Sequence, residues 1–421
     1  MKRKILGVVT VGLVLLSAAD VFSQPKASAK PIVIGVPVST AYPTGWMPER
    51  GIRLAAEEIN AAGGVSVGKE KRPLKLEVMD TRDLEPGTPI SDALVVVEKL
   101  ILEKKADFLA GGPSRSEATL AVMDLVAQYK KVHIMAAGSI SPAIAGKMAK
   151  DIQKYKYSFR ISGDSRWHGR VALNSLFGIE TKYGLNKVFF IVQDAAYARA
   201  GADGLRKGLE GKGWKTTGYE VYPMGTTDFS SGLLKAKGAG RGVLLVWMEA
   251  PEGAILAKQW YDMKVPVLPF GAPLEAVMSP GSWKAAQGKV EYCITNVPQL
   301  GNVPNEATPW TMKFNNAYNK RYGTLPDGTF SASGYESIYL LKDAIERTGT
   351  LDSEAVVKAL EKTDMVGVSG RLRFNKDHDL IYSDNPAEGM VIGQLQWQAG
   401  KRVLFYPPGV ATGEVKLPPW M

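Results

Sequence analysis

Apolar and polar positions alternate along most of the chain in blocks that predict strands followed by amphipathic helices. Residues 32–38 form an apolar run typical of a buried strand, and residues 49–62 carry apolar side chains at helical spacing. Gly63 and Gly64 then provide a helix stop. Such strand and helix units recur down the chain, which predicts parallel sheets covered by helices on both faces.

Two successive series of these units are visible, although no sequence repeat relates them. The first series comprises strands at 74–79, 108–110 and 132–136 with helices at 89–104 and 117–129. The second begins near residue 159 and comprises helices at 167–183, 200–209, 230–237 and 252–263 with strands at 188–193, 217–222, 243–247 and 265–269. Residues 304–360 then read as largely helical, and residues 390–397 with 402–405 as a hairpin. Because single cores stop growing near roughly 250 to 300 residues, a chain of 421 residues predicts two lobes.

The first 23 residues have the pattern of a secretory signal peptide. Three basic residues at positions 2–4 precede an apolar stretch over residues 5–16, and a plausible cleavage point follows Ser23. A membrane anchor is the alternative, but the stretch is short against the roughly 20 residues that a bilayer demands. We therefore expect an exported chain.

Charge and cysteine content say more about the cellular compartment of the protein than about its binding partner. The 52 lysines and arginines exceed the 42 aspartates and glutamates, giving a formal net charge of +10. This excess does not indicate nucleic acid, because aromatic residues are not interleaved with the basic ones in one stripe. Cys293 is the single cysteine, so it forms no intramolecular disulfide and is not the lipid-bearing first residue of a lipoprotein. We expect a soluble periplasmic protein.

Motif searches give little support to an enzyme or a metalloprotein. H-E-x-x-H and Cys-x-x-Cys are absent, and His133, His168 and His378 stand far apart in the sequence. We expect His133 to be a core residue and His378 to be solvated. Residues 63–69 match G-x-x-x-x-G-K, but they follow a helix and lack the Ser or Thr that holds magnesium, so we interpret the match as a chance one. We expect no catalytic residue, metal or cofactor, and keep an exported hydrolase as a minor alternative.

A resemblance to a known family rests on several segments in order. Residues 51–65 resemble the first helix of the branched-chain amino acid binding proteins of ABC transporters, the leucine/isoleucine/valine-binding protein family. The likeness continues through residues 79–83, 110–114, 136–139 and 193–197, and it covers most of the mature chain.

The resemblance implies an α/β fold of two Rossmann-like lobes joined by three hinge crossovers, the class I periplasmic binding protein fold. The crossings are placed near residues 160, 296 and 371. Lobe 1 would then comprise residues 31–159 and 297–371, and lobe 2 residues 160–296 and 372–421. Open α/β sheets bind ligands at the carboxyl ends of their strands, which agrees with a ligand held between the lobes.

The resemblance also implies which residues of the first lobe meet a ligand carboxylate. They follow the third and fourth strands and are Ser114, Arg115, Ser116, Gly138, Ser139 and Ile140, with Trp46 of the first loop as a candidate wall. Ser116 is equally suited to capping the helix that starts at Glu117, and Arg115 to a solvated position. Trp46 is as well explained by packing.

Candidates from the second lobe are fewer, and they leave the ligand class open. Tyr197 matches the cleft tyrosine of the family, while Trp167 and His168 either face the gap or pack at a helix start. A bound amino acid also needs an acidic partner for its ammonium, because a buried unpaired cation is strongly unfavourable. Pro273 occupies the position of the usual acid, so Glu249 and Glu275 are the substitutes. Ile140 also stands where members of the family often have a threonine that contacts the ligand carboxylate. With both differences, an aromatic or aliphatic carboxylate is an alternative to an amino acid as the predicted ligand.

The expected function is that of an extracytoplasmic solute receptor that delivers a small organic ligand to an ABC permease, without transforming it. We expect a monomer whose partners are the ligand and the permease, with no nucleic acid. A module that senses a ligand and signals to a protein partner is the alternative, and the sequence contains no fused signalling segment in its favour.

Overall fold

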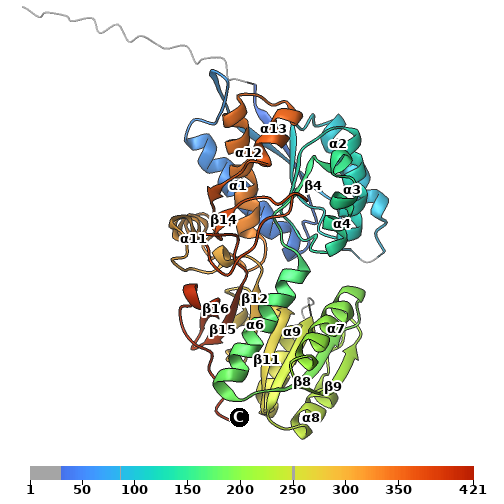
Figure 1. Cartoon of the computed structure of the whole chain (residues 1–421), viewed down its shortest axis with the longest axis vertical. Helices are drawn as coiled ribbons and strands as arrows, with labels where there is room; N and C mark the ends of the chain where they lie inside the picture. The colour runs from blue at the N-terminus through green and yellow to red at the C-terminus, as the bar shows by residue number, and fades with distance from the viewer. Residues whose placement is uncertain (1–29, 86, 249–251) are drawn as a thin grey trace, which may run out of the picture.

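The protein consists of two α/β bodies stacked along its longest axis (Figure 1). A computed structural model describes residues 30–85, 87–248 and 252–421. The predicted signal peptide lies outside these residues. We call the body built on the first sheet the first lobe and the body built on the second sheet the second lobe.

The elements follow one another in the alternation that the sequence predicts. The strands are β1 (Ile32–Val38), β2 (Val65–Val67), β3 (Glu70–Arg72), β4 (Leu74–Asp80), β5 (Phe108–Gly111), β6 (His133–Met135), β7 (Ser158–Arg160), β8 (Lys187–Gln193), β9 (Lys215–Tyr222), β10 (Gly242–Met248), β11 (Val267–Leu274), β12 (Ile294–Val297), β13 (Met365–Val366), β14 (Arg371–Leu372), β15 (Gly393–Gln398) and β16 (Lys401–Tyr406). The helices are α1 (Pro43–Ala61), α2 (Ile90–Leu102), α3 (Ser116–Gln128), α4 (Pro142–Lys150), α5 (Ile152–Tyr155), α6 (Ser165–Tyr183), α7 (Ala196–Glu210), α8 (Ser230–Gly238), α9 (Glu252–Met263), α10 (Ser282–Ala285), α11 (Pro309–Tyr322), α12 (Ser331–Thr348) and α13 (Ser353–Leu360). Short 3₁₀ turns are η1 (Glu275–Val277), η2 (Leu300–Asn302) and η3 (Pro408–Val410).

The two lobes carry separate sheets. The first has the order β4-β1-β5-β6-β7 and is parallel throughout. The second has the order β16-β15-β12-β11-β10-β8-β9, and only the β12-β15-β16 side is antiparallel. Strands buried on both faces read as continuous apolar runs, which explains why β1, β8 and β10 were visible in the sequence.

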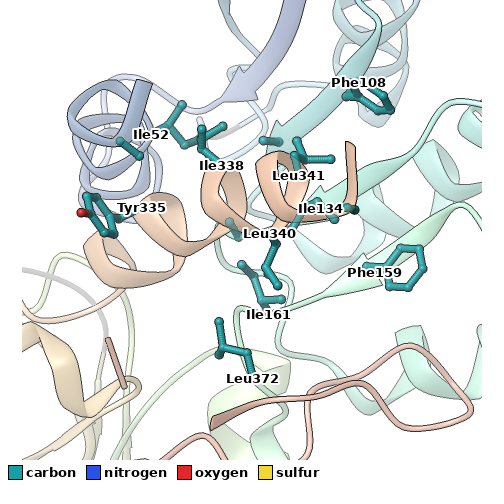
Figure 2. Close-up of a cluster of buried hydrophobic side chains, with 14 of the residues drawn as sticks. Ile52, Phe108, Ile134, Phe159, Ile161, Tyr335, Ile338, Leu340, Leu341 and Leu372 are labelled. Atoms are coloured by element: carbon teal, nitrogen blue, oxygen red, sulfur yellow. The ribbon is translucent and has the colours of Figure 1, made fainter. Parts of the chain in front are cut away.

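Helix α12 completes the core of the first lobe, although it lies far along the chain. It packs between α1 and the sheet, and Figure 2 shows Ile338, Leu340 and Leu341 of this helix among side chains from α1, β5, β6 and β7. The contact with α1 is close because Gly51 and Gly334 lack side chains. A Cβ on Gly51 would lie 2.0 Å from the carbonyl oxygen of Ser331, and one on Gly334 would lie 2.1 Å from that of Pro48.

Three chain crossings between the lobes lie side by side. The side chain of Gln299, after β12, donates to the carbonyl of Ile161, after β7, at 3.0 Å. The amide of Leu300 donates to the carbonyl of Val391, before β15, at 3.0 Å. Each crossing is therefore hydrogen bonded to a neighbouring crossing, which is the arrangement of a three-stranded hinge.

Packing amends the proposed lobe boundaries near the C-terminus. Leu372, Phe374, Leu380 and Met390 all belong to the apolar cluster of the first lobe. The proposed third crossing therefore moves from near residue 371 to near residue 392, because residues between these positions bury their apolar side chains against the first sheet. The lobe assignment of the whole chain stays a proposal.

Several elements differ from the sequence prediction. Helix α1 starts at Pro43 rather than near Glu49, with the proline in its first turn, where no amide donor is needed. Helices α4 and α5 and the β2-β3 hairpin were not predicted, because they are short and carry weak apolar periodicity. Across the described part of the chain, no helix is long and apolar enough to span a membrane.

Candidate functional site

The loops that follow β5 and β6 meet at the carboxyl edge of the first sheet. The amide of Ser139 donates to the carbonyl of Ser114 at 2.8 Å, and the amide of Ser141 donates to the hydroxyl of Ser116 at 3.3 Å. Both loops end in helices, α3 and α4, whose N-termini lie at this edge. Five of the six residues expected after the third and fourth strands thus lie in these two bonded loops, and the sixth, Ser116, is the first residue of α3.

Helix α3 presents its N-terminus without a side-chain cap. Its N-cap residue is Arg115, whose side chain makes no capping bond. The hydroxyl of Ser116 accepts from Ser141 instead, so the structure does not use Ser116 as a cap. The first amides of a helix and its dipole favour an anion. This end of α3 is therefore suited to a carboxylate.

The loop after β6 is held in a backbone conformation that few residues adopt. Gly138 has a φ of 49° and Ser139 a φ of 58°. A Cβ on Gly138 would lie 2.3 Å from the carbonyl oxygen of Ser114, so this position requires glycine. The hydroxyl of Ser139 is bonded to Pro113 O at 2.8 Å and to the Thr119 hydroxyl at 2.5 Å. Both bonds hold the Ser139 hydroxyl within the loop, and a role of Ser139 in ligand binding stays a prediction.

Asp83 supports the loop after β5, a role that sequence reasoning missed. Its carboxylate accepts from the amide of Arg115 at 2.6 Å and from the hydroxyl of Thr81. Asp83 is 3% exposed, so both carboxylate oxygens are bonded within the protein. The signal that would have found it is a carboxylate just after a buried strand, at the same sheet edge as the serines.

Arg115 and Trp46 lie at the rim of this edge. The Arg115 side chain is half exposed and its Nε lies 3.3 Å from Glu117. The hydroxyl of Ser114 donates to the carbonyl of Thr44 at 3.3 Å, which ties this loop to the start of α1, where Trp46 lies. Trp46 is partly buried and stacks on the guanidinium of Arg50 at 4.5 Å. It therefore has both a packing role and an exposed portion.

Trp167 and His168 lie at the hinge. His168 is buried, and its Nδ1 is 2.8 Å from the Nδ2 of Asn296 on β12, so it joins the first and second crossings. Burial lowers the pKa of His168 to about 4, which keeps it neutral. Trp167 packs on Tyr382, with ring centroids 5.4 Å apart. These contacts favour the packing alternative for both residues, and a role in ligand binding remains a prediction.

The candidates from the second lobe are placed only in part. Tyr197 lies in the first turn of α7 and Glu275 begins η1, so each follows a strand of the second sheet. Glu249 follows β10 and lies outside the described residues. Their predicted roles stay predictions.

All three histidines are buried in the structure. His133 is buried, with its Nε2 2.9 Å from Gly112 O and its pKa lowered by burial to about 4. The expectation of a solvated His378 is wrong, because this residue is 3% exposed and stacks on Phe159 at 4.1 Å. Within residues 30–85, 87–248 and 252–421, no group of three or more His, Cys, Asp or Glu residues is arranged to hold a metal.

One hydrolase-like spacing lies in a hairpin. Residues 64–68 read G-x-S-x-G, and they also overlap the G-x-x-x-x-G-K match. Ser66 lies in β2, and its amide donates to Glu346 at 3.0 Å. A nucleophile elbow needs a strand, a sharp turn and then a helix, whereas β2 pairs with β3. Both matches are therefore parts of a hairpin.

Comparison with known proteins identifies the family. A family model described as periplasmic binding protein matches residues 31–400. The chain belongs to the periplasmic binding protein family. The predicted family is thereby confirmed, and so is the fold class of two Rossmann-like lobes joined by three crossovers.

Proteins with similar sequences or structures come from several bacteria. Leu/Ile/Val-binding protein homolog 7 of Brucella abortus (strain 2308) is 24% identical, over 96% of this chain and 99% of its own. A putative branched-chain amino acid ABC transporter structure from Silicibacter pomeroyi is 22% identical with a TM-score of 0.79, over 93% of this chain and 100% of its own. An ABC transporter solute binding protein from R. palustris in complex with benzoate is 16% identical with a TM-score of 0.69, over 93% and 99%.

Proposed function

We propose that this periplasmic binding protein is an extracytoplasmic solute receptor for a small organic carboxylate, which it binds between its lobes and delivers to an ABC permease. The bound molecule leaves unchanged, so the protein is not an enzyme. Export through the N-terminal signal peptide would place it in the periplasm. The solved structures from Silicibacter pomeroyi and R. palustris support a permease as the partner, since both are named for ABC transporters.

The uncapped N-terminus of α3 is the observation that most supports a carboxylate as the ligand. It lies where the loops after β5 and β6 meet, and its N-cap residue Arg115 adds a cationic side chain. The amide of Ile140 has no acceptor within the described residues, so it too is available to a ligand oxygen. A carboxylate bound here would accept hydrogen bonds and face positive charge.

The class of carboxylate is the finer part of the proposal. One relative is named for leucine, isoleucine and valine, and one structural neighbour holds benzoate. Asp83 and Asp80, at the edge of the first sheet, are engaged by Arg115 and by Thr40. An ammonium partner would therefore have to come from Glu249 or Glu275 of the second lobe, or from the exposed Glu117 beside Arg115. We propose that the ligand carries a carboxylate, which amino acids and simple organic acids share. The amino group is the feature in which these two ligand classes differ.

The test is a matched ligand panel measured by thermal shift and calorimetry. Ligand binding to the native state alone raises the apparent melting temperature by mass action. Leucine and 4-methylpentanoate differ only in the amino group, while leucinamide and benzamide replace the carboxylate of leucine and benzoate by a neutral amide. We expect saturable binding of at least one carboxylate and at least about tenfold weaker binding of its amide.

The panel also separates the ligand classes and can contradict the proposal. Tighter binding of leucine than of 4-methylpentanoate would show an ammonium site, and the reverse order would show a simple carboxylate site. If the folded protein binds no carboxylate of the panel, or binds amides equally well, the carboxylate proposal is wrong. Release of a chemically altered product would contradict the statement that it is not an enzyme.

A further inference from the structure

Arg160 is a buried cation with a complete set of partners at the hinge. It is the last residue of β7 and is 1% exposed. Its Nε and Nη2 donate to the two carboxylate oxygens of Asp379 at 2.6 Å each, and its Nη2 also donates to Asp164 at 2.7 Å. Its Nη1 donates to the carbonyls of Ser139 and Ser141 at 3.2 and 2.7 Å. A guanidinium has five N–H donors, and here all five are used.

The charges of this cluster balance, which is why a charged arginine is tolerated in the interior. Arg160 and the exposed Arg166 face Asp164 and Asp379, since Arg166 also donates to Asp164 at 2.7 Å. Burial alone would disfavour the charge on Arg160, but the two carboxylates outweigh it and hold its pKa above the ordinary value. A buried cation is strongly unfavourable without such partners.

The two carbonyls held by Arg160 belong to the loop that is proposed to bind the ligand. A peptide unit is planar and trans, so its C=O and N–H point in opposite directions. Because the carbonyl of Ser139 points at Arg160, the amide of Ile140 in the same peptide unit points away from it. This is the amide without an acceptor in the described residues. Arg160 thus fixes the direction of a donor that is available to a ligand.

The same loop is joined to the first crossing. The carbonyl of Ile140 accepts from the amide of Ser165, the first residue of α6, at 2.9 Å. Asp164 caps α6 through the amide of Arg166, and it is also bonded to Arg160. On the other side, Asp379 lies beside Arg160 as a parallel bridge, so the segment before the third crossing is attached as well. The loop, the start of α6 and that segment therefore share one side chain.

We propose that Arg160 is a positioning residue that aims the Ile140 amide at the ligand and links occupancy of this loop to the orientation of α6, and so to lobe closure. The inference rests on the proposed function, because it assumes that the loop after β6 meets the ligand. A ligand that bonds the Ile140 amide would stabilise the loop geometry that α6 shares, which favours the closed arrangement of the lobes.

The test replaces the guanidinium fork and keeps the charge. Arg160→Lys retains one cationic donor but cannot hold Asp379, Asp164 and both loop carbonyls together. Affinity for leucine and benzoate is measured by calorimetry well below the melting temperature, and lobe closure by the ligand-induced fall in radius of gyration in X-ray scattering. We expect affinity at least about tenfold weaker than that of the wild type and a smaller compaction at saturation.

Two further variants keep the test decisive. Arg321→Lys is the matched control, because Arg321 also makes a bidentate pair, with Glu57, on the exposed α1-α11 surface. It should change neither affinity nor compaction. Asp379→Asn is nearly isosteric and replaces Arg160→Lys if the latter does not fold, with the same direction of effect expected on both readouts.

The outcomes separate this inference from the proposed function. If the wild type binds a carboxylate but the folded Arg160→Lys or Asp379→Asn protein binds and compacts equally well, with only a lower melting temperature, Arg160 is merely structural and the inference is overturned. If the wild type itself binds neither leucine nor benzoate nor any other carboxylate tested, the proposed function fails, and the inference falls with it.

Discussion

The side-chain amide of Gln299 donates to the carbonyl oxygen of Ile161 at 3.0 Å and so joins two of the three crossings between the lobes. Its Oε1 accepts from the amide of Ser333 in α12 at 2.6 Å. Gln299 is 0% exposed. One buried amide therefore attaches the first two crossings to the core of the first lobe. Any bending of the hinge has to keep these bonds or exchange them.

Gln299→Ala is expected to lower the free energy of unfolding by about 2 kcal/mol, because it leaves the Ile161 carbonyl and the Ser333 amide buried without partners. Urea denaturation measures the change. Gln153→Ala, at an exposed position of α5, is the control and should stay within about 0.5 kcal/mol of the wild type. Equal stabilities of the two variants would show that the Gln299 bonds do not matter for folding.

Glu336 predicts a pH dependence of stability. It is buried in α12, its Oε1 accepts from the amides of Val368 and Ser369, and burial raises its pKa to about 7. A carboxyl group whose folded pKa is raised contributes stability that is fully present below its unfolded pKa of about 4.5 and is lost as the pH rises through 7. The contribution is on the order of 3 kcal/mol, from 1.36 kcal/mol per pKa unit.

The measurement compares Glu336→Gln with the wild type by denaturation between pH 4 and pH 8. The glutamine cannot ionise, so the stability difference between the two proteins should shift in favour of the variant as the pH rises from 4.5 to 7. Using the difference cancels other titrating groups, among them His133 and His168. A difference that stays constant across this range would mean that Glu336 keeps an ordinary pKa.

Gly138→Ala tests the conformation of the loop after β6. The substitution places a Cβ 2.3 Å from the Ser114 carbonyl at a φ of 49°, so it should cost about 2 kcal/mol or more and weaken carboxylate binding. Gly146→Ala in α4 is the matched control. Its Cβ would meet no atom within 4 Å, and we expect a gain of about 0.5 kcal/mol with unchanged binding. Equal effects of the two changes would refute the strained loop.

Trp420 is expected to hold the C-terminal segment on the second lobe. Its ring packs against Trp260 and Tyr261, and its Nε1 donates to Val265 O at 3.0 Å. Trp420→Ala should lower stability by about 2 kcal/mol, since a partly buried ring is lost. Trp420→Phe should cost less, because one aromatic ring is kept for packing, although the hydrogen bond and part of the indole surface are lost.

Chemical denaturation of both Trp420 variants measures this effect, and Met224→Ala is the control, since Met224 is 66% exposed. Carboxylate affinity should be unchanged in all three proteins, because the C-terminus lies at the end of the second lobe remote from the first (Figure 1). If Trp420→Ala were as stable as the wild type, the C-terminal segment would not contribute to the fold.

Cys293 is expected to be unreactive in the native protein. It is fully buried, and burial raises the pKa of its thiol, which removes the reactive thiolate. A thiol reagent such as dithionitrobenzoate should therefore label the native protein slowly and the unfolded protein quickly, with one equivalent per chain. Rapid labelling under native conditions would contradict the burial of this residue.

The sequence determined much of the fold because buried parallel strands leave long apolar runs. Strand β1 and helix α9 have the bounds that the pattern predicts, β8 starts one residue earlier than predicted, and β10 extends one residue further at each end. Short helices such as α5 and the β2-β3 hairpin left no comparable signal. The sequence placed residues 372–421 in the second lobe, whereas Leu372, Phe374, Leu380 and Met390 pack in the apolar cluster of the first lobe. Which core an apolar residue joins is not encoded in local periodicity.

The candidate site also has one part that the sequence could predict and another that only the tertiary structure decides. The segments after β5 and β6 could be named from the sequence, since the carboxyl edge of a parallel sheet follows from the order of elements. The sequence could not show that the Ser139 hydroxyl is bonded within its loop, that Asp83 accepts from the amide of Arg115, or that Arg160 donates to five acceptor atoms. These contacts join residues up to 219 positions apart, between Arg160 and Asp379, and only the packing of the tertiary structure decides which of them meet.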